Sequence, residues 1–465
     1  MTGVATALPR LCWMHVEPRQ RKISEQGRRL AGRARDRLFG PAEYGEADPV
    51  RLPEPEERAV YRILNFALRA GNIMLSSGAG TIEVESTILA LTAACGLRHC
   101  EVDVTFTSMT ASYIRGDDVE PITTLQVVRR RRVDYSRLAG VHALRADLVS
   151  GRITPDEAFR RLDDLAGAPE RRRQFVVLSW AGMAAAFTVL LGGGWLVAVV
   201  AFASTAAVYS MNRALARRGI PDFFLSALGA AVATAFAMLL VAFDAPAMPS
   251  LVVAGGIMVL VPGYALVASV QDALTGFPIS AGARGLEVLL AAIGIITGVA
   301  AVLYASVSLG VVISLGSVTA TPFVYLPLQV AAAGVASALY GAATAVPRRS
   351  LLAAGVVGAL GWAAFLFLRH GGLSLIAATA VAAVVVGVSG NVLAGRHRTH
   401  PFLYVVPGIM PLVPGLALYQ AMLDLFTTQQ GGKALLQAFG IGLAIAAGVT
   451  LGNIIVRPLR RPVTR

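Results

Sequence analysis

The stretch GIMVLVPGYAL at residues 256–266 returns, little changed, as GIMPLVPGLAL at residues 408–418. Over the 21-residue windows that begin with these stretches, 11 of 21 positions are identical. Each copy holds a Pro-Gly pair near the middle of an apolar run that has roughly the 20 residues a helix needs to cross a bilayer. The repeat therefore predicts two related membrane segments, each with a break in its helix at the Pro-Gly pair.

Acidic side chains are rare after residue 173, which separates the chain into two parts. Five of the 28 Asp and Glu residues lie there: Asp222, Asp244, Asp272, Glu287 and Asp424. Long apolar runs fill the sequence between them, as is typical of an integral membrane protein. The net charge of +13 fits basic loops at a membrane better than a nucleic-acid surface, because the basic block at residues 129–132 is short.

Ten apolar spans are expected in the membrane part. They cover residues 174–191, 195–211, 222–243, 250–270, 286–309, 323–345, 351–368, 373–391, 402–423 and 435–456. With ten crossings, nearly all arginines of the connecting loops fall on one side of the membrane, and Arg369 and Lys433 lie opposite. By the positive-inside rule that side is the cytoplasm, so the sequence predicts a plasma-membrane protein with both termini in the cytoplasm.

The shift that aligns the two Pro-Gly stretches also relates the first span to the sixth and the third to the eighth. We therefore divide the membrane part into two five-helix units, residues 172–315 and 316–458, followed by a basic cytosolic tail at 459–465. Because five is odd, the second unit enters the membrane from the opposite side, which makes an inverted repeat of the kind found in secondary transporters. The two breaks are then expected to face each other.

The breaks are the predicted substrate site. Proline lacks an amide hydrogen and clashes with the carbonyl four residues earlier, so the carbonyls of Met258 and Met410 are expected to lose their helical partners. Broken helices offer both amide and carbonyl ends to a zwitterion. The alternative is a simple proline kink that local adjustment satisfies. The candidate substrate-binding residues are Met258, Pro262, Gly263, Tyr264, Met410, Pro414 and Gly415.

Three ionisable residues in or beside the spans are candidates for proton coupling or gating: Glu287, Asp272 and Asp424. The alternative for Glu287 is an ion pair with Arg284, three residues earlier. Asp272 and Asp424 are repeat mates near the ends of their spans, where solvation at the membrane surface is the alternative. For Tyr264 the alternatives are a ring face offered to an ammonium group and an anchor at the membrane interface.

The front of the chain predicts a flexible tail, residues 1–56, followed by a cytosolic α/β domain, residues 57–168. The tail is rich in Arg, Glu, Pro and Gly and has too few large apolar residues to fold. Apolar periodicity and capping residues predict the elements of the domain. They are helices from Glu57 to a cap at Gly78 and from Thr81 to Gly96, strands within 100–114 and 121–128, and helices at 136–148 and after the N-cap Thr154.

No constellation typical of catalysis stands in the sequence. It holds no nucleophile-base pair, Walker motif or metal-ligand spacing, and its three cysteines, Cys12, Cys95 and Cys100, match no common zinc pattern. We therefore expect neither an enzyme nor an ATP-driven pump, and neither a cofactor nor a metal.

Two stretches of the front part carry a family resemblance: GNIMLSSGAGTIEVESTILALTAACGL at residues 71–97 and VTFTSMTASYI at residues 104–114. With the ten spans behind them, they resemble the threonine/serine exporters, in the full-length actinobacterial form that has both five-helix units in one chain. The resemblance covers about residues 58–456. It implies export of small hydroxy amino acids across the plasma membrane, driven by the proton motive force. The motif positions singled out are Gly78, Thr81 and Glu85.

The leading functional hypothesis is a secondary exporter of threonine and serine that works by alternating access around the paired breaks. One alternative is a small dicarboxylate exporter, because relatives with the two units in separate proteins are associated with dicarboxylate export. The other is a ligand-gated channel or sensor with a cytosolic binding domain. The expected partners are an amino-acid substrate and the lipid bilayer, without nucleic acid, and formation of a homo-oligomer is left open.

Overall fold

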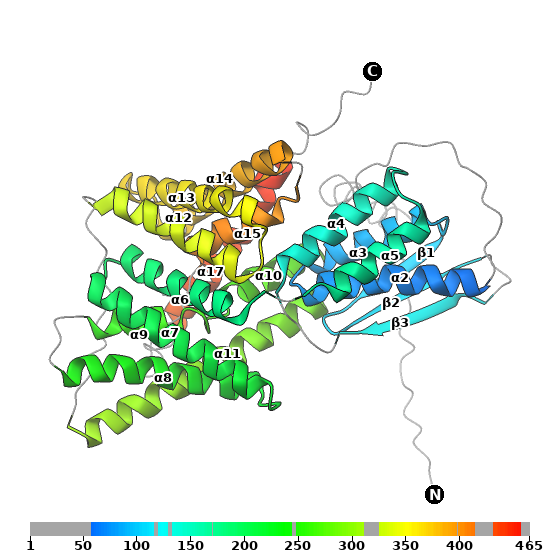
Figure 1. Ribbon diagram of the computed structural model, residues 1–465. Coiled ribbons are helices and arrows are strands. Elements are labelled where there is room, and N and C mark those ends of the chain that lie inside the picture. The colour runs from blue at the N-terminus through cyan, green and yellow to red at the C-terminus, as the bar shows by residue number, and fades with distance from the viewer. Residues whose placement is uncertain are drawn as a thin grey trace, which may run out of the picture. The chain divides into compact units, whose positions relative to one another are not determined.

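The computed structural model describes residues 57–115, 120–128, 133–169, 171–243, 248–310, 325–397, 399–413 and 431–456. Within them the chain is mainly helical and has a three-stranded sheet (Figure 1). Several sequence-based predictions lie outside the described residues: the tails at 1–56 and 459–465, the unit boundary near 315, and Pro414, Gly415 and Asp424.

Residues 57–167 form four helices and a small antiparallel sheet. The helices are α2 (Glu57–Ser76), α3 (Thr81–Ala94), α4 (Tyr135–Val149) and α5 (Pro155–Gly167), and the strands are β1 (Cys100–Val104), β2 (Ser108–Tyr113) and β3 (Ile122–Val127). The strands pair in the order β1-β2-β3, with Val102 opposite Ala111 and Ala111 opposite Thr124. The helices and strands expected in this part are therefore confirmed, with ends shifted by a few residues.

Helix α2 carries much of the core of this part. Its apolar residues recur at helical spacing, and Leu64 and Met74 are fully buried where α2 packs on α3 and the sheet. After α2 the chain turns at Gly78, whose φ of 95° is a left-handed conformation that glycine adopts without strain. Helix α5 begins as predicted, with Thr154 as its N-cap and Pro155 in its first turn. The turn at Gly78 sets the direction in which α3 starts.

Behind this part lie eight helices that are long and apolar enough to cross a membrane, counted over the described residues. Large apolar side chains such as Leu352 and Phe367 are exposed on them, as expected of surfaces that meet lipid. The helix expected from 286 begins earlier, at Pro278, so Arg284 lies inside a helix. The eight are α6 (Arg173–Leu190), α7 (Trp195–Ala216), α8 (Asp222–Ala242), α11 (Pro278–Ser308), α12 (Leu326–Ala343), α13 (Arg348–His370), α14 (Leu375–His397) and α17 (Gly431–Val456).

The other two expected spans are discontinuous. At the fourth, α9 (Pro249–Ile257) ends before the Pro-Gly pair and α10 (Gly263–Leu274) begins after Pro262. The structure favours a break over a simple proline kink for this segment, because residues 258–262 belong to neither helix, although Met258 keeps helical dihedral angles. At the ninth, α15 (Phe402–Ile409) passes into a 3-10 turn, η2 (Met410–Leu412), and the structure describes the chain again from 431.

The membrane helices pack in two sets with matching neighbours. In the first set α8 packs on α11 and α7 packs on α8; in the second α14 packs on α17 and α13 packs on α14. Glycines permit these close approaches. A Cβ added at Gly298 of α11 would overlap the Ala227 carbonyl of α8, and one added at Gly452 of α17 would lie 2.9 Å from the Val384 carbonyl of α14. The two sets meet where α6 packs on α12.

Candidate functional site

The two helix breaks lie against each other. Gly263, the first residue of α10, faces Val413, which directly follows η2: a Cβ added at Gly263 would overlap Cγ1 of Val413. Met258 and Met410, where the two breaks begin, are both buried. The described parts of the two breaks are therefore in direct contact, as the sequence repeat predicts.

Tight turns pair several backbone groups in the breaks. The Gly263 amide donates to the Val261 carbonyl at 2.8 Å. In the second break the Val413 amide donates to the Met410 carbonyl at 3.3 Å. The Met410 carbonyl, predicted to lose its helical partner at Pro414, accepts from an amide three residues later instead of four, because the chain forms a 3-10 turn here.

Two polar side chains of α7, Ser204 and Asn212, lie beside the first break. Ser204 Oγ and Asn212 Oδ1 are buried and have no hydrogen-bond partner among the described residues, which is costly inside a protein. A Cβ added at Gly256 would lie 2.6 Å from Ser204 Oγ, and one added at Gly229 would lie 2.8 Å from Leu260 and 3.1 Å from Asn212 Nδ2. Sequence reasoning missed both residues, although their spacing of eight puts them on one helix face.

At the far end of α10, Asp272 forms a buried ion pair with Arg284 of α11. Arg284 Nε lies 2.9 Å from Asp272 Oδ2. The backbone of residues 79–81 completes the group: the Thr81 amide donates to Asp272 Oδ1 at 3.1 Å, and Arg284 donates to the Ala79 carbonyl at 3.2 Å. The first turn of α3 thus offers a free amide to a carboxylate, which is the charge that helix N-termini favour.

The turn at Gly78 and the side chain of Tyr264 extend this contact. The Tyr264 hydroxyl donates to the Gly78 carbonyl at 2.9 Å. The Arg284 guanidinium lies 5.4 Å from the centre of the Phe106 ring, within the range of a cation–π interaction. Four of the sequence-based candidates are therefore close neighbours: Gly78, Thr81, Tyr264 and Asp272.

Two sequence-based alternatives at this place are wrong. Asp272 is not a solvated helix end, because Arg284 and the backbone of 79–81 cover its carboxylate. The Tyr264 hydroxyl is not an anchor at the lipid interface, because it binds the Gly78 carbonyl. Arg284 pairs with Asp272 of the neighbouring helix. The alternative of an ion pair between Glu287 and Arg284 stays a prediction, and Glu287 is an exposed residue one turn further along α11.

Glu85 does not belong to this group. It lines a cavity of about 480 Å³ in the front part, together with Cys100, Glu101 and Asp103 at the sheet. The motif GAGTIEVES therefore has two faces: its start contacts α10 and α11, and Glu85 faces β1.

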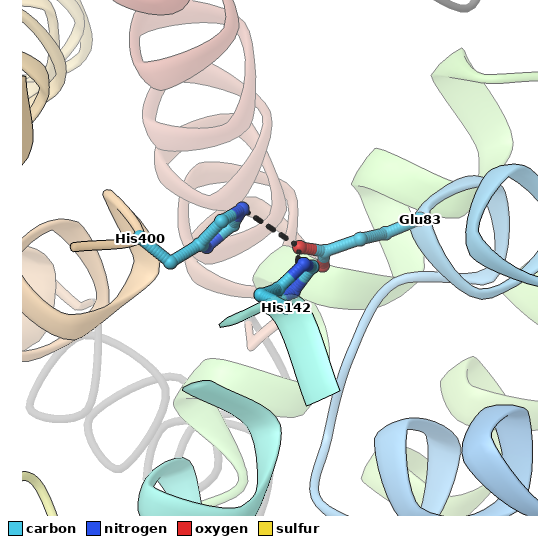
Figure 2. A group of neighbouring side chains, drawn as sticks. All are labelled: Glu83, His142 and His400. Carbon is cyan, nitrogen blue, oxygen red and sulfur yellow. Dashed lines mark ion pairs between the residues drawn. The ribbon is translucent and has the colours of Figure 1, made fainter. Parts of the chain in front are cut away.

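A second polar cluster, not predicted from the sequence, consists of Glu83, His142 and His400 (Figure 2). Glu83 Oε1 lies 2.9 Å from His142 Nε2 and 3.4 Å from His400 Nε2. Burial raises the pKa of Glu83, but the charges of the two histidines and Arg145 outweigh it and bring the pKa to about 2. The three residues come from α3, α4 and the connection between α14 and α15, so no local spacing could have revealed them.

Comparisons with known proteins match most of the chain. One family model, described as "Putative threonine/serine exporter", matches residues 65–305, and another, described as "Threonine/Serine exporter, ThrE", matches residues 329–455. A "Threonine/serine exporter" of Corynebacterium glutamicum is 34% identical over 423 residues, which cover 89% of this chain and 86% of the relative. A "Probable threonine/serine exporter" of Mycobacterium tuberculosis is 35% identical over 413 residues, covering 86% of this chain and 77% of the relative.

A shorter match links the chain to an uncharacterized protein of Haemophilus influenzae. The two are 32% identical over 80 residues, which are 17% of this chain and 27% of that protein. No solved structure matches the chain.

Proposed function

Because the chain belongs to the threonine/serine exporter family, we propose that it exports threonine and serine across the plasma membrane, driven by the proton motive force. The chain is a multi-pass membrane protein and, as a member of a transporter family, not an enzyme. The observation that carries the proposal is the contact between the two helix breaks at Gly263 and Val413. Discontinuous helices that meet inside a membrane protein are the usual substrate site of secondary transporters.

We assign ten membrane crossings, eight by the long helices and two by the broken segments. In this assignment α9 and α10 together make one crossing, and α15 with the residues after it makes another. Matching neighbours in the two helix sets support two inverted five-helix units, 172–315 and 316–458. The separate family matches, which end at 305 and begin at 329, support the same division. The termini and the α/β domain at 57–168 then lie in the cytoplasm.

The chemistry of the breaks suits a small zwitterion with a hydroxyl group. The amides at the start of α10 carry partial positive charge that attracts a carboxylate, and carbonyls in the breaks attract an ammonium group. Ser204 and Asn212 have hydrogen-bonding capacity that the described residues do not use. We assign the substrate hydroxyl to one of these two side chains, because a buried polar group gains most from a partner that arrives with the substrate. The two stand eight residues, or about 12 Å, apart along α7, so they cannot share it.

The contact between the breaks supports a closed state of the proposed site. Gly263 has no side chain, and Val413 fills the space that one would occupy. A substrate that binds between the breaks must therefore separate them. Relative movement of the two five-helix units would do this from each side in turn, which is alternating access.

Asp272 is the proposed gate on the α10 side. Its carboxylate holds Arg284 and the Thr81 amide at once, so it joins α10, α11 and the start of α3. Protonation of Asp272 would remove the charge that holds both partners. Proton binding could thus be coupled to release of α10 from its neighbours. Glu287 and Asp424 remain further candidates for proton coupling.

Purified protein in vesicles, loaded with labelled threonine, serine or succinate under an imposed pH gradient, tests the function. We expect threonine and serine to move and their flux to stop when the gradient is dissipated. Movement of succinate without threonine would replace the proposal with dicarboxylate export. If none of the three solutes moves, the proposed transport function is wrong.

Pro262→Ala tests the role of the break, because alanine lets the helix continue. We expect normal membrane insertion and impaired transport. Pro249→Ala is the matched control, since Pro249 occupies the first turn of α9, where proline leaves no helical hydrogen bond unmade. A reporter fused at residue 350 tests the topology, and a position outside the cell would contradict the inverted repeat.

A further inference from the structure

We propose that Glu83, His142 and His400 form a binding site for a divalent transition-metal ion, with Zn²⁺ the best fit. The ion would link α3 and α4 of the front part to the connection between α14 and α15. This inference concerns a different place from the helix breaks and does not depend on which solute is transported.

The donor atoms lie at distances that suit one ion. Glu83 Oε1 is 2.9 Å from His142 Nε2 and 3.4 Å from His400 Nε2, and the three ligand atoms lie within 4.8 Å of one another. Ligands bound tetrahedrally to Zn²⁺ at about 2.0–2.1 Å are roughly 3.4 Å apart. Two imidazoles and one carboxylate form the ligand set of Zn²⁺, Co²⁺ or Fe²⁺, whereas Mg²⁺ and Ca²⁺ prefer oxygen alone.

His142 faces the Glu83 carboxylate directly. Its buried Nε2 atom lies 2.9 Å from Glu83 Oε1, in an orientation that does not make a linear hydrogen bond. A metal ion needs no donor hydrogen along the line between the two atoms, so it satisfies a nitrogen and an oxygen that face each other in this way.

Exposure of the three side chains defines a route of entry. The side chains of His142, Glu83 and His400 are 9%, 21% and 31% exposed. His142 and Glu83 are fixed on helices, and His400, the most open, stands in a short connection. An ion would therefore approach past His400, and water on that side can fill the fourth coordination position.

Binding requires His400 to move. The two imidazole rings are stacked, with centroids 3.7 Å apart and planes 5° from parallel, so their nitrogens cannot both point at one ion. The Phe402 amide also donates to His400 Nδ1 at 3.4 Å, a long hydrogen bond that must be lost when Nε2 binds metal and Nδ1 keeps the proton. Rotation of His400 away from His142 both unstacks the two rings and breaks the hydrogen bond from the Phe402 amide.

The positive charge of Arg145 opposes the ion. Arg145 contributes to the low pKa of Glu83, and its guanidinium donates to Thr87 Oγ1 at 3.2 Å. Removing this charge should reduce the repulsion of the ion, so Arg145→Gln is expected to tighten metal binding. Removing a metal ligand should weaken binding instead. The opposite effects on affinity distinguish Arg145, which repels the ion, from the three ligands.

Metal content of the full chain in detergent, purified without a polyhistidine tag, tests the proposal. After incubation with Zn²⁺ and dialysis, we expect one ion per chain, a raised melting temperature, and a visible absorption spectrum of a nitrogen-ligated ion when Co²⁺ replaces Zn²⁺. Glu83→Gln, His142→Gln and His400→Gln should each weaken binding by about 100-fold or more, because even loss of an outer-shell partner costs about 10–100-fold. His99→Gln, at an exposed histidine, is the matched control and should bind as the unchanged chain does.

The outcomes separate a metal site from a simple hydrogen-bonded cluster. If the chain binds no Zn²⁺ or Co²⁺, or if binding survives in all three ligand variants, the proposal is wrong. Melting curves recorded without metal show whether each variant folds. A variant that melts like the unchanged chain without Zn²⁺, yet gains nothing from Zn²⁺, supports the site even if its transport is altered.

Discussion

Arg284 Nε lies 2.9 Å from Asp272 Oδ2, and the two side chains are only 9% and 1% exposed. The pair joins α10 to α11, and the Thr81 amide and the Ala79 carbonyl bind its outer atoms. Removing one member of a buried pair leaves an uncompensated charge, which is more harmful than removing both. The contribution of the pair to stability can therefore be tested by comparing single and double variants.

Asp272→Asn should lower the free energy of unfolding by about 3–5 kcal/mol, because Arg284 stays buried without its counter-ion. Melting in detergent measures the loss. The double variant Asp272→Asn with Arg284→Gln should recover part of it, and Asp222→Asn, at an exposed acid in the first turn of α8, should change stability by less than about 0.5 kcal/mol. Additive effects of the two single changes would show that the residues do not depend on each other.

Gly263→Ala should impair both stability and transport, because its methyl group would overlap Val413. Overpacking of this kind costs about 1–3 kcal/mol. Val413→Ala in the same chain should restore most of the loss. Gly282→Ala is the control, since a Cβ there meets nothing within 4 Å. Initial transport rates and melting temperatures measure the rescue. If Val413→Ala restores neither, the two breaks do not depend on each other.

One of the variants Ser204→Ala and Asn212→Ala should reduce the preference for threonine over the analogue 2-aminobutyrate, which has no hydroxyl. The other should leave it unchanged, because the two side chains lie too far apart along α7 to bind the same hydroxyl. Loss of one hydrogen bond of about 1.4 kcal/mol corresponds to a roughly tenfold fall in selectivity. Thr234→Val is the control, because its hydroxyl is already bonded to the Ala230 carbonyl of its own helix. Competition between the two solutes in vesicles measures the effect, and an unchanged ratio in both variants would place the hydroxyl elsewhere.

Glu83→Gln should abolish an acid-dependent part of the stability. The pKa of Glu83 falls from its ordinary 4.5 to about 2 in the folded chain, so its ion pairs stabilise the fold fully above about pH 4.5. That contribution is lost as the pH falls towards 2. The difference in melting temperature between the unchanged chain and Glu83→Gln should therefore shrink as the pH falls from about 4.5 towards 2. A difference that grows in acid would contradict the assigned charge.

Sequence patterns predicted those features that depend on interactions between neighbouring residues. The cap at Thr154 and the alternating strand at Val102 were readable because both depend on neighbours within a few residues. The break at Pro262 was readable for the same reason: proline removes a hydrogen bond when it stands beyond the first turn of a helix. The sequence did not show that the carbonyl of Met410 is paired in a 3-10 turn, because turn type depends on the packing around it.

Contacts between distant segments were not predictable in this way. Asp272 was expected at a solvated helix end, yet its partner Thr81 stands 191 residues earlier. Glu83, His142 and His400 share no spacing that a metal motif would have. Only Ser204 and Asn212 left a local signal, since they lie on one face of an apolar helix where buried polar groups are unusual.

Residues 78–83 contact both proposed membrane units at once. Gly78, Ala79 and Thr81 bind α10 and α11 of the first unit, and Glu83 reaches His400 of the second. A trans peptide chain advances only about 3.8 Å per residue between Cα atoms. A segment of six residues therefore cannot stay in contact with both membrane units when they move apart. If the units move against each other in transport, the front part must let go of one of them in every cycle. The rate of that release then sets an upper limit on how many molecules leave the cell each second.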